Sequence, residues 1–409
     1  MTLPRFFKNK CLLLVLCFWG FSSGSIQAQS LSPDARISLI TCSPGDELYS
    51  MYGHSAIRVN DPSYGIDYVF NYGTFDFRTP NFYPKFVMGK LKYKLAVSDF
   101  SDFLAAYQYY NRSVYEQVLN LTPQQKNEVF RFLQTNYLPE NREYYYDFFF
   151  DNCATRIRDV FTNTLHSNLK FDPAVGQKKQ SFRQIVGIYQ NPFPWADFGV
   201  DLAMGLPSDQ QATVTQYMFI PDYLQESFAK ATVSSATGKY AFAQPVTTLF
   251  KATAPQPTTD SILKPMVVCW LLFGLGALLT FWQWQQQRAA YTFDVIIFGL
   301  TGLLGFVLLF LTTSSEYKAF PKNLNLLWAI PLHLPLALLL LQRKTRDFLK
   351  NYFLLTAGLM ALLLILWRWL PQEYHPAFFP LVWLLGLRAA FIYLHEKQKK
   401  PAYQNKSTF

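Results

Sequence analysis

Hydrophobic positions along this 409-residue chain gather at its two ends. The first segment carries three cations, then an apolar run from Cys11 to Phe21, then small and polar residues up to Ala28. This layout is typical of a secretory signal peptide, so we expect residues 1–28 to be removed on export. Beyond residue 264 there are five long apolar runs: Pro265 to Trp284, Phe293 to Thr313, Leu324 to Leu341, Tyr352 to Leu370, and Ala377 to Leu394. Each is near the roughly 20 residues that a helix needs to cross a bilayer, which predicts a five-helix transmembrane domain over 265–394.

The loops between these runs differ in charge. With the residues before 265 on the exported side, the outer loops hold only Lys318, Lys322 and Arg368. The inner loops and tail hold Arg288, Arg343, Lys344, Arg346, Lys350, Lys397, Lys399, Lys400 and Lys406. This asymmetry follows the positive-inside rule and predicts an inner-membrane protein with a periplasmic N-terminal domain and a cytoplasmic tail, 395–409. The net charge of +10 then requires no nucleic-acid partner.

The exported part, residues 29–228, mixes the two periodicities of secondary structure. Alternation predicts strands over Arg36 to Thr41, His54 to Val59 and Ile66 to Asn71, the last two joined as a hairpin. The run Thr122-Pro123-Gln124-Gln125 predicts a helix start, and apolar residues at three- and four-residue steps predict another helix after Cys153. Residues 229–264 are rich in Thr, Ala, Ser and Pro and are interpreted as a tether. The pattern therefore indicates one α+β domain joined to a membrane bundle.

A cysteine at the start of a predicted helix is the most informative chemical feature. The helix dipole and backbone N–H groups would favour the thiolate of Cys153, which is the reactive form. A thiol nucleophile also needs a base, and His54 is the candidate. Asp67 and Asn71 share one face of the following strand, and either could orient the imidazole; we favour Asn71. His166 follows a predicted helix end, where a histidine commonly interacts with the dipole.

A structural role for Cys153 is the alternative, either as a buried thiol or as one half of a disulfide with Cys42. For His54 alone, a histidine without chemistry would be the better interpretation, so the hypothesis rests on the pair. The exported part has too few Cys and His residues for a recognisable zinc spacing, so we expect no metal and no cofactor.

Residues 144–150 form an aromatic run just before the cysteine. Tyr146 and Phe149 are candidates for lining an apolar slot that takes an acyl chain, although a buried strand explains the run equally well. Arg58 alternates with His54 along its strand and is a candidate for a phosphate head group, against the ordinary expectation of a solvated charge. Asn323, Asn325 and His333 near the third apolar run are further candidates for lipid contact.

Three runs resemble a known family: Leu39 to Ser50, Gly53-His54-Ser55-Ala56-Ile57-Arg58, and Asp151-Asn152-Cys153-Ala154-Thr155-Arg156. They are similar to the bacterial Lnb-type lipoprotein N-acyltransferases, in which an exported domain like a circularly permuted NlpC/P60 papain-like fold precedes a multi-helix membrane anchor. The resemblance implies that Cys153 is the nucleophile and His54 the base. It implies no secure third residue, so Asn71 stays a hypothesis.

The resemblance also implies a reaction. The substrate would be the N-terminal diacylglyceryl-cysteine of exported lipoproteins, acylated through a Cys153 thioester with a membrane phospholipid as acyl donor. A papain-like hydrolase acting on peptidoglycan peptides or lipids is the main alternative, because this fold hosts both activities. A non-enzymatic membrane receptor or assembly factor with a Cys42–Cys153 disulfide is the third.

Overall fold

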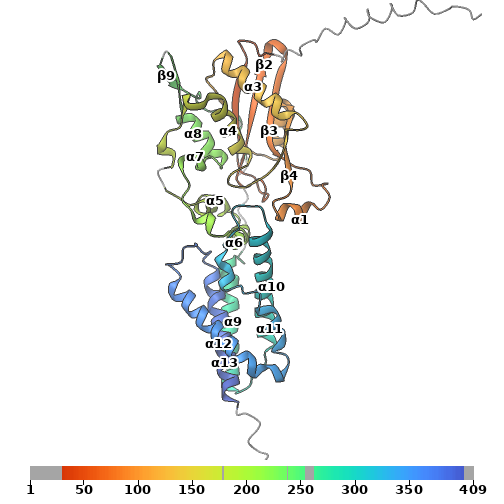
Figure 1. The fold of residues 1–409 in the computed structure, drawn as a ribbon, viewed down its shortest axis with the longest axis vertical. Helices are drawn as coiled ribbons and strands as arrows, with labels where there is room; N and C mark the ends of the chain where they lie inside the picture. The colour runs from red at the N-terminus through yellow and green to blue at the C-terminus, as the bar shows by residue number, and fades with distance from the viewer. Residues whose placement is uncertain (1–29, 177–178, 237, 254–261, 400–409) are drawn as a thin grey trace, which may run out of the picture.

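An antiparallel seven-stranded sheet forms the centre of the exported domain, in the order β10-β5-β1-β2-β3-β4-β6 (Figure 1). The computed structural model describes residues 30–176, 179–236, 238–253 and 262–399, so the predicted signal peptide and most of the predicted tail lie outside the described residues. The strands of this sheet are β1 (Arg36–Cys42), β2 (His54–Asp61), β3 (Ile66–Thr74), β4 (Lys92–Asp99), β5 (Val114–Val118), β6 (Glu143–Tyr145) and β10 (Thr247–Phe250). The three predicted strands are thus confirmed, including the hairpin that carries His54.

Helices cover both faces of the sheet. The exported helices are α1 (Phe82–Val87), α2 (Phe100–Tyr109), α3 (Pro123–Tyr137), α4 (Cys153–Leu165), α5 (Phe182–Gln190), α6 (Pro194–Ala203), α7 (Val214–Tyr217) and α8 (Pro221–Lys230). Alternate residues of β2 point to opposite sides: Ile57 and Val59 join the core beneath α3 and α4, and Ala56 joins a smaller core beneath α2. The capping box predicted at Thr122 is present, which explains why α3 begins there.

Part of the expected tether is ordered structure. It contains three strands, β8 (Thr232–Ser235), β9 (Gly238–Ala241) and β10. Strands β8 and β9 pair with β7 (Leu169–Lys170), and β10 adds an edge strand to the main sheet beside β5. Composition alone suggested a loose linker because the segment is poor in large apolar residues. Hydrogen bonding to β7 and to the β5 edge of the main sheet stabilises these strands despite their composition.

Four helices in the described residues are long and apolar enough to cross a membrane: α9 (Pro265–Gln285), α10 (Thr292–Ser314), a helical stretch over residues 343–366 that contains α12 (Arg346–Leu366), and α13 (Phe378–Gln398). The third predicted run is not one continuous helix. It forms a 3-10 turn, Leu324–Leu327, and the short helix α11 (His333–Leu339) beside α10. Pro331, which lies between them, explains the break, because proline lacks the N–H that a helix interior needs.

A buried ion pair joins three helices of the bundle. The Arg388 guanidinium of α13 binds both carboxylate oxygens of Asp294 in α10, each at 2.7 Å. It also donates to Thr280 and Gln283 of α9. Because Arg388 and Asp294 are fully buried and partnered, they fix how the helices meet.

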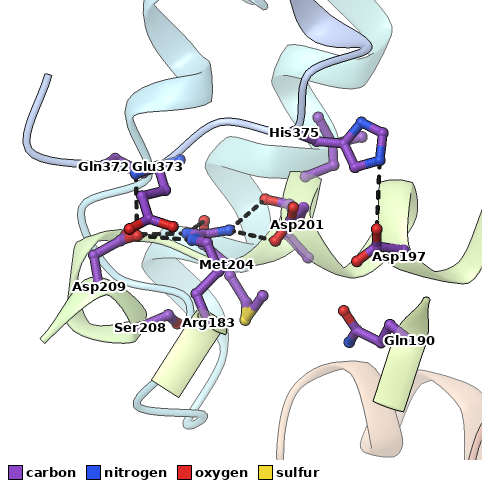
Figure 2. A network of polar contacts seen from close by, with 12 residues as sticks. Arg183, Gln190, Asp197, Asp201, Met204, Ser208, Asp209, Gln372, Glu373 and His375 are labelled. Carbon is purple, nitrogen blue, oxygen red and sulfur yellow. Dashed lines mark hydrogen bonds and ion pairs between the residues drawn. The ribbon is translucent and has the colours of Figure 1, made fainter. Parts of the chain in front are cut away.

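The exported domain docks on the outer loops of the bundle. Arg183 of α5 is almost fully buried and binds Asp209 and Asp201, each at 2.8 Å, and Asp209 accepts from the Glu373 N–H in the loop before α13 (Figure 2). Nearby, the Phe198 ring of α6 packs on Phe378 at 5.0 Å. These contacts set the domain at a fixed place above the membrane helices.

Candidate functional site

The start of α4 is held by an unusually complete cap. The Asn152 side-chain oxygen accepts from the N–H groups of Ala154 and Thr155, both at 2.9 Å. Its amide nitrogen donates to the carbonyl oxygens of Phe148 and Phe219, both at 2.8 Å. The cap therefore joins the first turn of α4 to the preceding loop and to the segment before α8, and it places Cys153 as the first helical residue.

The Cys153 thiol is buried, with 7 % exposed surface. Burial raises its pKa, and hydrogen bonds from the backbone N–H groups of Ser55, Ala154 and Cys153 itself oppose that shift, as does the charge of Arg112. The N–H groups at the helix start thus lower the pKa of Cys153, as predicted, but desolvation raises this pKa by more. The resting group is a thiol and not the thiolate that the sequence suggested. The Ser55 contact also brings the sulfur to the start of β2, at the residue that follows His54 in the chain.

His54 contacts one of its two predicted partners. Its Nε2 lies 2.6 Å from the Asn71 side-chain oxygen on β3. Because a carboxamide oxygen only accepts, Nε2 carries the proton and Nδ1 keeps the lone pair. Burial lowers the pKa of His54 to about 4, with the Asn71 bond opposing and Arg112 adding to the shift. At neutral pH the imidazole is therefore uncharged and able to accept a proton. Asp67 instead pairs with Arg58.

Cys42 lies opposite His54 in the β1–β2 register, yet it is a free, buried thiol, as is Cys153. The structure thus carries no Cys42–Cys153 disulfide. Burial raises the pKa of Cys42 to about 12, so this thiol is inert.

Arg112 lies near the site and was not suggested by the sequence. Its guanidinium donates twice to the Ser43 carbonyl oxygen, at 2.9 and 2.7 Å. Its charge lowers the pKa values of Cys42, His54 and Cys153, so it favours thiolate and opposes imidazolium. The turn Asn111-Arg112-Ser113 has no sequence signature of a site; only the folding of α2 back to β1 brings it there.

The three predicted substrate-binding residues lie in three different parts of the domain. Tyr146 lies near Cys153, because both pack against Gly73 of β3. A methyl group in place of the Gly73 hydrogen would lie 3.6 Å from the Cys153 Cβ and 3.7 Å from the Tyr146 ring. Phe149 faces another cluster, stacked on Phe182 at 4.7 Å. The Arg58 guanidinium binds Asp67 and Glu116 and covers the Phe100 ring at 3.5 Å. Of these three residues, only Tyr146 lies near Cys153.

The polar residues near the third apolar run make internal contacts. Asn323 and Asn325 donate to the Leu202 carbonyl oxygen at 2.8 and 3.1 Å, which ties the loop to α6. His333 lies 2.6 Å from the Tyr352 hydroxyl. Within the described residues, no group of three or more His, Cys, Asp and Glu side chains is arranged to hold a metal ion.

Comparison with known families gives two matches that follow the two parts of the fold. Residues 24–185 match the Lnb N-terminal periplasmic domain, and residues 257–400 match the Lnb transmembrane domain, which has five helices. No curated protein and no solved structure matches the chain. The α+β domain carrying Cys153 and His54 is therefore periplasmic and the helical part lies in the inner membrane. Because it matches both Lnb domains, this chain belongs to the Lnb family.

Proposed function

We propose that this chain is a thiol acyltransferase that N-acylates the N-terminal diacylglyceryl-cysteine of lipoproteins, with a phospholipid as acyl donor and Cys153 as the acyl carrier. The observation that supports this most is a buried thiol at a helix start that accepts a hydrogen bond from the backbone N–H of Ser55, the residue that follows the neutral, Asn71-bound His54. Membership of a membrane-anchored family suggests a lipoprotein-modifying enzyme and agrees with both substrates being lipids. The cytoplasmic placement of the C-terminus belongs to the same proposal.

In the first half-reaction, the Cys153 sulfur attacks an ester carbonyl of the phospholipid while His54 Nδ1 takes the thiol proton. The backbone N–H of Cys153 at the helix start is suited to stabilise the negative charge that develops on the carbonyl oxygen. The C–O ester bond then breaks, and the imidazolium returns the proton to the departing lysophospholipid oxygen. The products are a thioester on Cys153 and a lysophospholipid.

In the second half-reaction, the neutral α-amine of the lipoprotein cysteine attacks the thioester carbonyl. His54 accepts the proton from nitrogen, the C–S bond breaks, and the proton passes to the leaving sulfur. A thioester suits this step because sulfur is a better leaving group than an alkoxide, so an amine attacks it readily. The amide bond forms and the resting thiol and imidazole are restored.

The test is direct detection of the acyl-enzyme. The full-length protein, reconstituted with a phospholipid of one defined acyl chain, should gain the mass of that acyl group on a peptide containing Cys153. Cys153→Ser and His54→Ala should abolish acylation of an added diacylated lipopeptide, whereas Cys42→Ser should retain it, because that thiol is buried and lies outside the proposed chemistry. Full acylation of the lipopeptide by both site variants would refute the proposal. Cleavage of muropeptides by the wild-type protein would support the hydrolase alternative.

A further inference from the structure

The segment between β3 and β4 exposes large apolar side chains. Phe77 and Tyr83 are 61 % and 73 % exposed, and Val87 at the end of α1 is 38 % exposed. Tyr49, from the loop after β1, packs on the Phe77 ring at 6.4 Å and is itself 60 % exposed. We call Tyr49, Phe77, Tyr83 and Val87 the aromatic edge. An aqueous surface rarely gathers such residues unless it contacts something apolar.

The aromatic edge lies at the level where the bundle leaves the membrane. Helix α1 sits at the lower end of the exported domain beside the top of α10 (Figure 1). The Val87 carbonyl oxygen accepts from the Ser315 hydroxyl at 3.0 Å, and the Met88 carbonyl oxygen accepts from the Glu316 N–H at 2.9 Å. Because Ser314 is the last residue of α10, these bonds fix the edge at the outer membrane surface.

The charge of the segment suits a lipid head-group layer. Residues 75–90 contain Arg78, Lys85 and Lys90 against the single carboxylate of Asp76, which leaves a net charge of +2. Arg78 pairs with Asp76, and Lys90 lies 3.9 Å from Glu316 beyond the end of α10. Aromatic rings with flanking cations are the usual composition of protein surfaces that rest in the interfacial region of a bilayer.

A continuous series of ring contacts connects the aromatic edge to the thiol. Tyr146, beside Cys153, stacks on Tyr93 with centroids 4.4 Å apart. Tyr93 contacts Phe75 at 5.2 Å, and Phe75 contacts the exposed Phe77 at 5.0 Å. This series forms unbroken apolar contact from the exposed Phe77 ring, through the buried Tyr93, to the residue near the sulfur.

We propose that residues 75–90 enter the head-group layer of the outer leaflet and guide a phospholipid acyl chain to Cys153. The guiding role rests on the proposed acyl transfer, whereas the membrane contact does not. The occupant of the aromatic edge is therefore the bilayer itself and not a protein partner.

Membrane contact is tested on the full-length protein in nanodiscs. An environment-sensitive fluorophore is attached at Tyr83→Cys, with the unsubstituted protein as background, since its described thiols are buried. The matched control is Tyr64→Cys, which is 57 % exposed in the β2–β3 turn at the opposite end of the sheet. Spin-labelled phospholipid should quench the fluorophore at position 83 and leave position 64 unchanged. Equal quenching at both positions, or quenching at 83 only after a lipopeptide is added, would overturn the proposal.

The guiding role is tested with Phe77→Ser/Tyr83→Ser. We expect about tenfold slower Cys153 acylation from bilayer phospholipid, because two large side chains no longer bury apolar surface in the lipid. Acylation by a water-soluble short-chain thioester should be unchanged. Equal loss with both donors would mean that the rings only hold the site together, and it would overturn the guiding role. A wild-type protein that forms no adduct with phospholipid would refute the acyl transfer, while the quenching result would still decide the membrane contact.

Discussion

Replacing Asn152 by alanine tests how the position of the cysteine is maintained. The substitution removes the acceptor for two N–H groups of α4, a loss that typically costs about 1–2 kcal/mol. It also leaves the Phe148 and Phe219 carbonyl oxygens without this donor, at about 1 kcal/mol each when buried. The sum of about 3–4 kcal/mol corresponds to a melting temperature lower by about 6–16 °C for a domain of this size.

The measurement is thermal unfolding of the purified full-length protein in detergent, followed by circular dichroism at one scan rate. The matched control is Ser181→Ala, which removes the N-cap acceptor of α5 and no second link, so about 1 kcal/mol and about 2–4 °C are expected. Asn152→Ser keeps an acceptor and should fall between the two. If Asn152→Ala lowers the midpoint no more than Ser181→Ala, the links to Phe148 and Phe219 contribute nothing and the reasoning fails.

Three further predictions concern the site and its support. Because burial lowers the pKa of His54 to about 4, single-turnover acylation should stay constant from about pH 8 to about pH 5 and fall with a midpoint near 4; a midpoint at the ordinary histidine pKa would contradict this. Asn71→Ala should slow acylation by about 10- to 100-fold through loss of imidazole orientation, whereas Asp67→Ala should leave the rate within about twofold of wild type. Gly205→Ala places a Cβ 2.0 Å from the Pro321 carbonyl oxygen, so hydrogen exchange should rise over residues 315–323 while the sheet stays protected; unchanged exchange there would argue against a fixed docking contact.

Local patterns predicted the framework of the exported domain well. Strands β1 to β3 and the α3 and α4 starts follow from alternation, helical periodicity and capping residues, all of which act over a few positions. The choice between Asp67 and Asn71 could not be made from the strand pattern, since both side chains share one face. It needed the position of His54 across the hairpin, which the fold alone supplies.

Long-range effects account for the differences. The thiolate expected for Cys153 depended on a helix dipole visible in the sequence, whereas the desolvation that outweighs it comes from residues distant along the chain. Strand β10 pairs with β5, more than a hundred positions earlier, so its low hydrophobicity gave no hint of it. Arg112 likewise reaches the site only through tertiary packing.

The docking of α5 and α6 on the outer loops limits which substrates the protein could meet. A domain bound to the outer loops by hydrogen bonds, such as those from the Glu373 N–H to Asp209 and from the Asn323 amide to the Leu202 carbonyl oxygen, stays at the membrane surface and does not swing outward into the periplasm. Encounters would then depend on lateral diffusion of lipids and lipoproteins within the same bilayer. Under the proposed chemistry, a lipoprotein that has already departed for another membrane is out of reach, so modification would have to precede release.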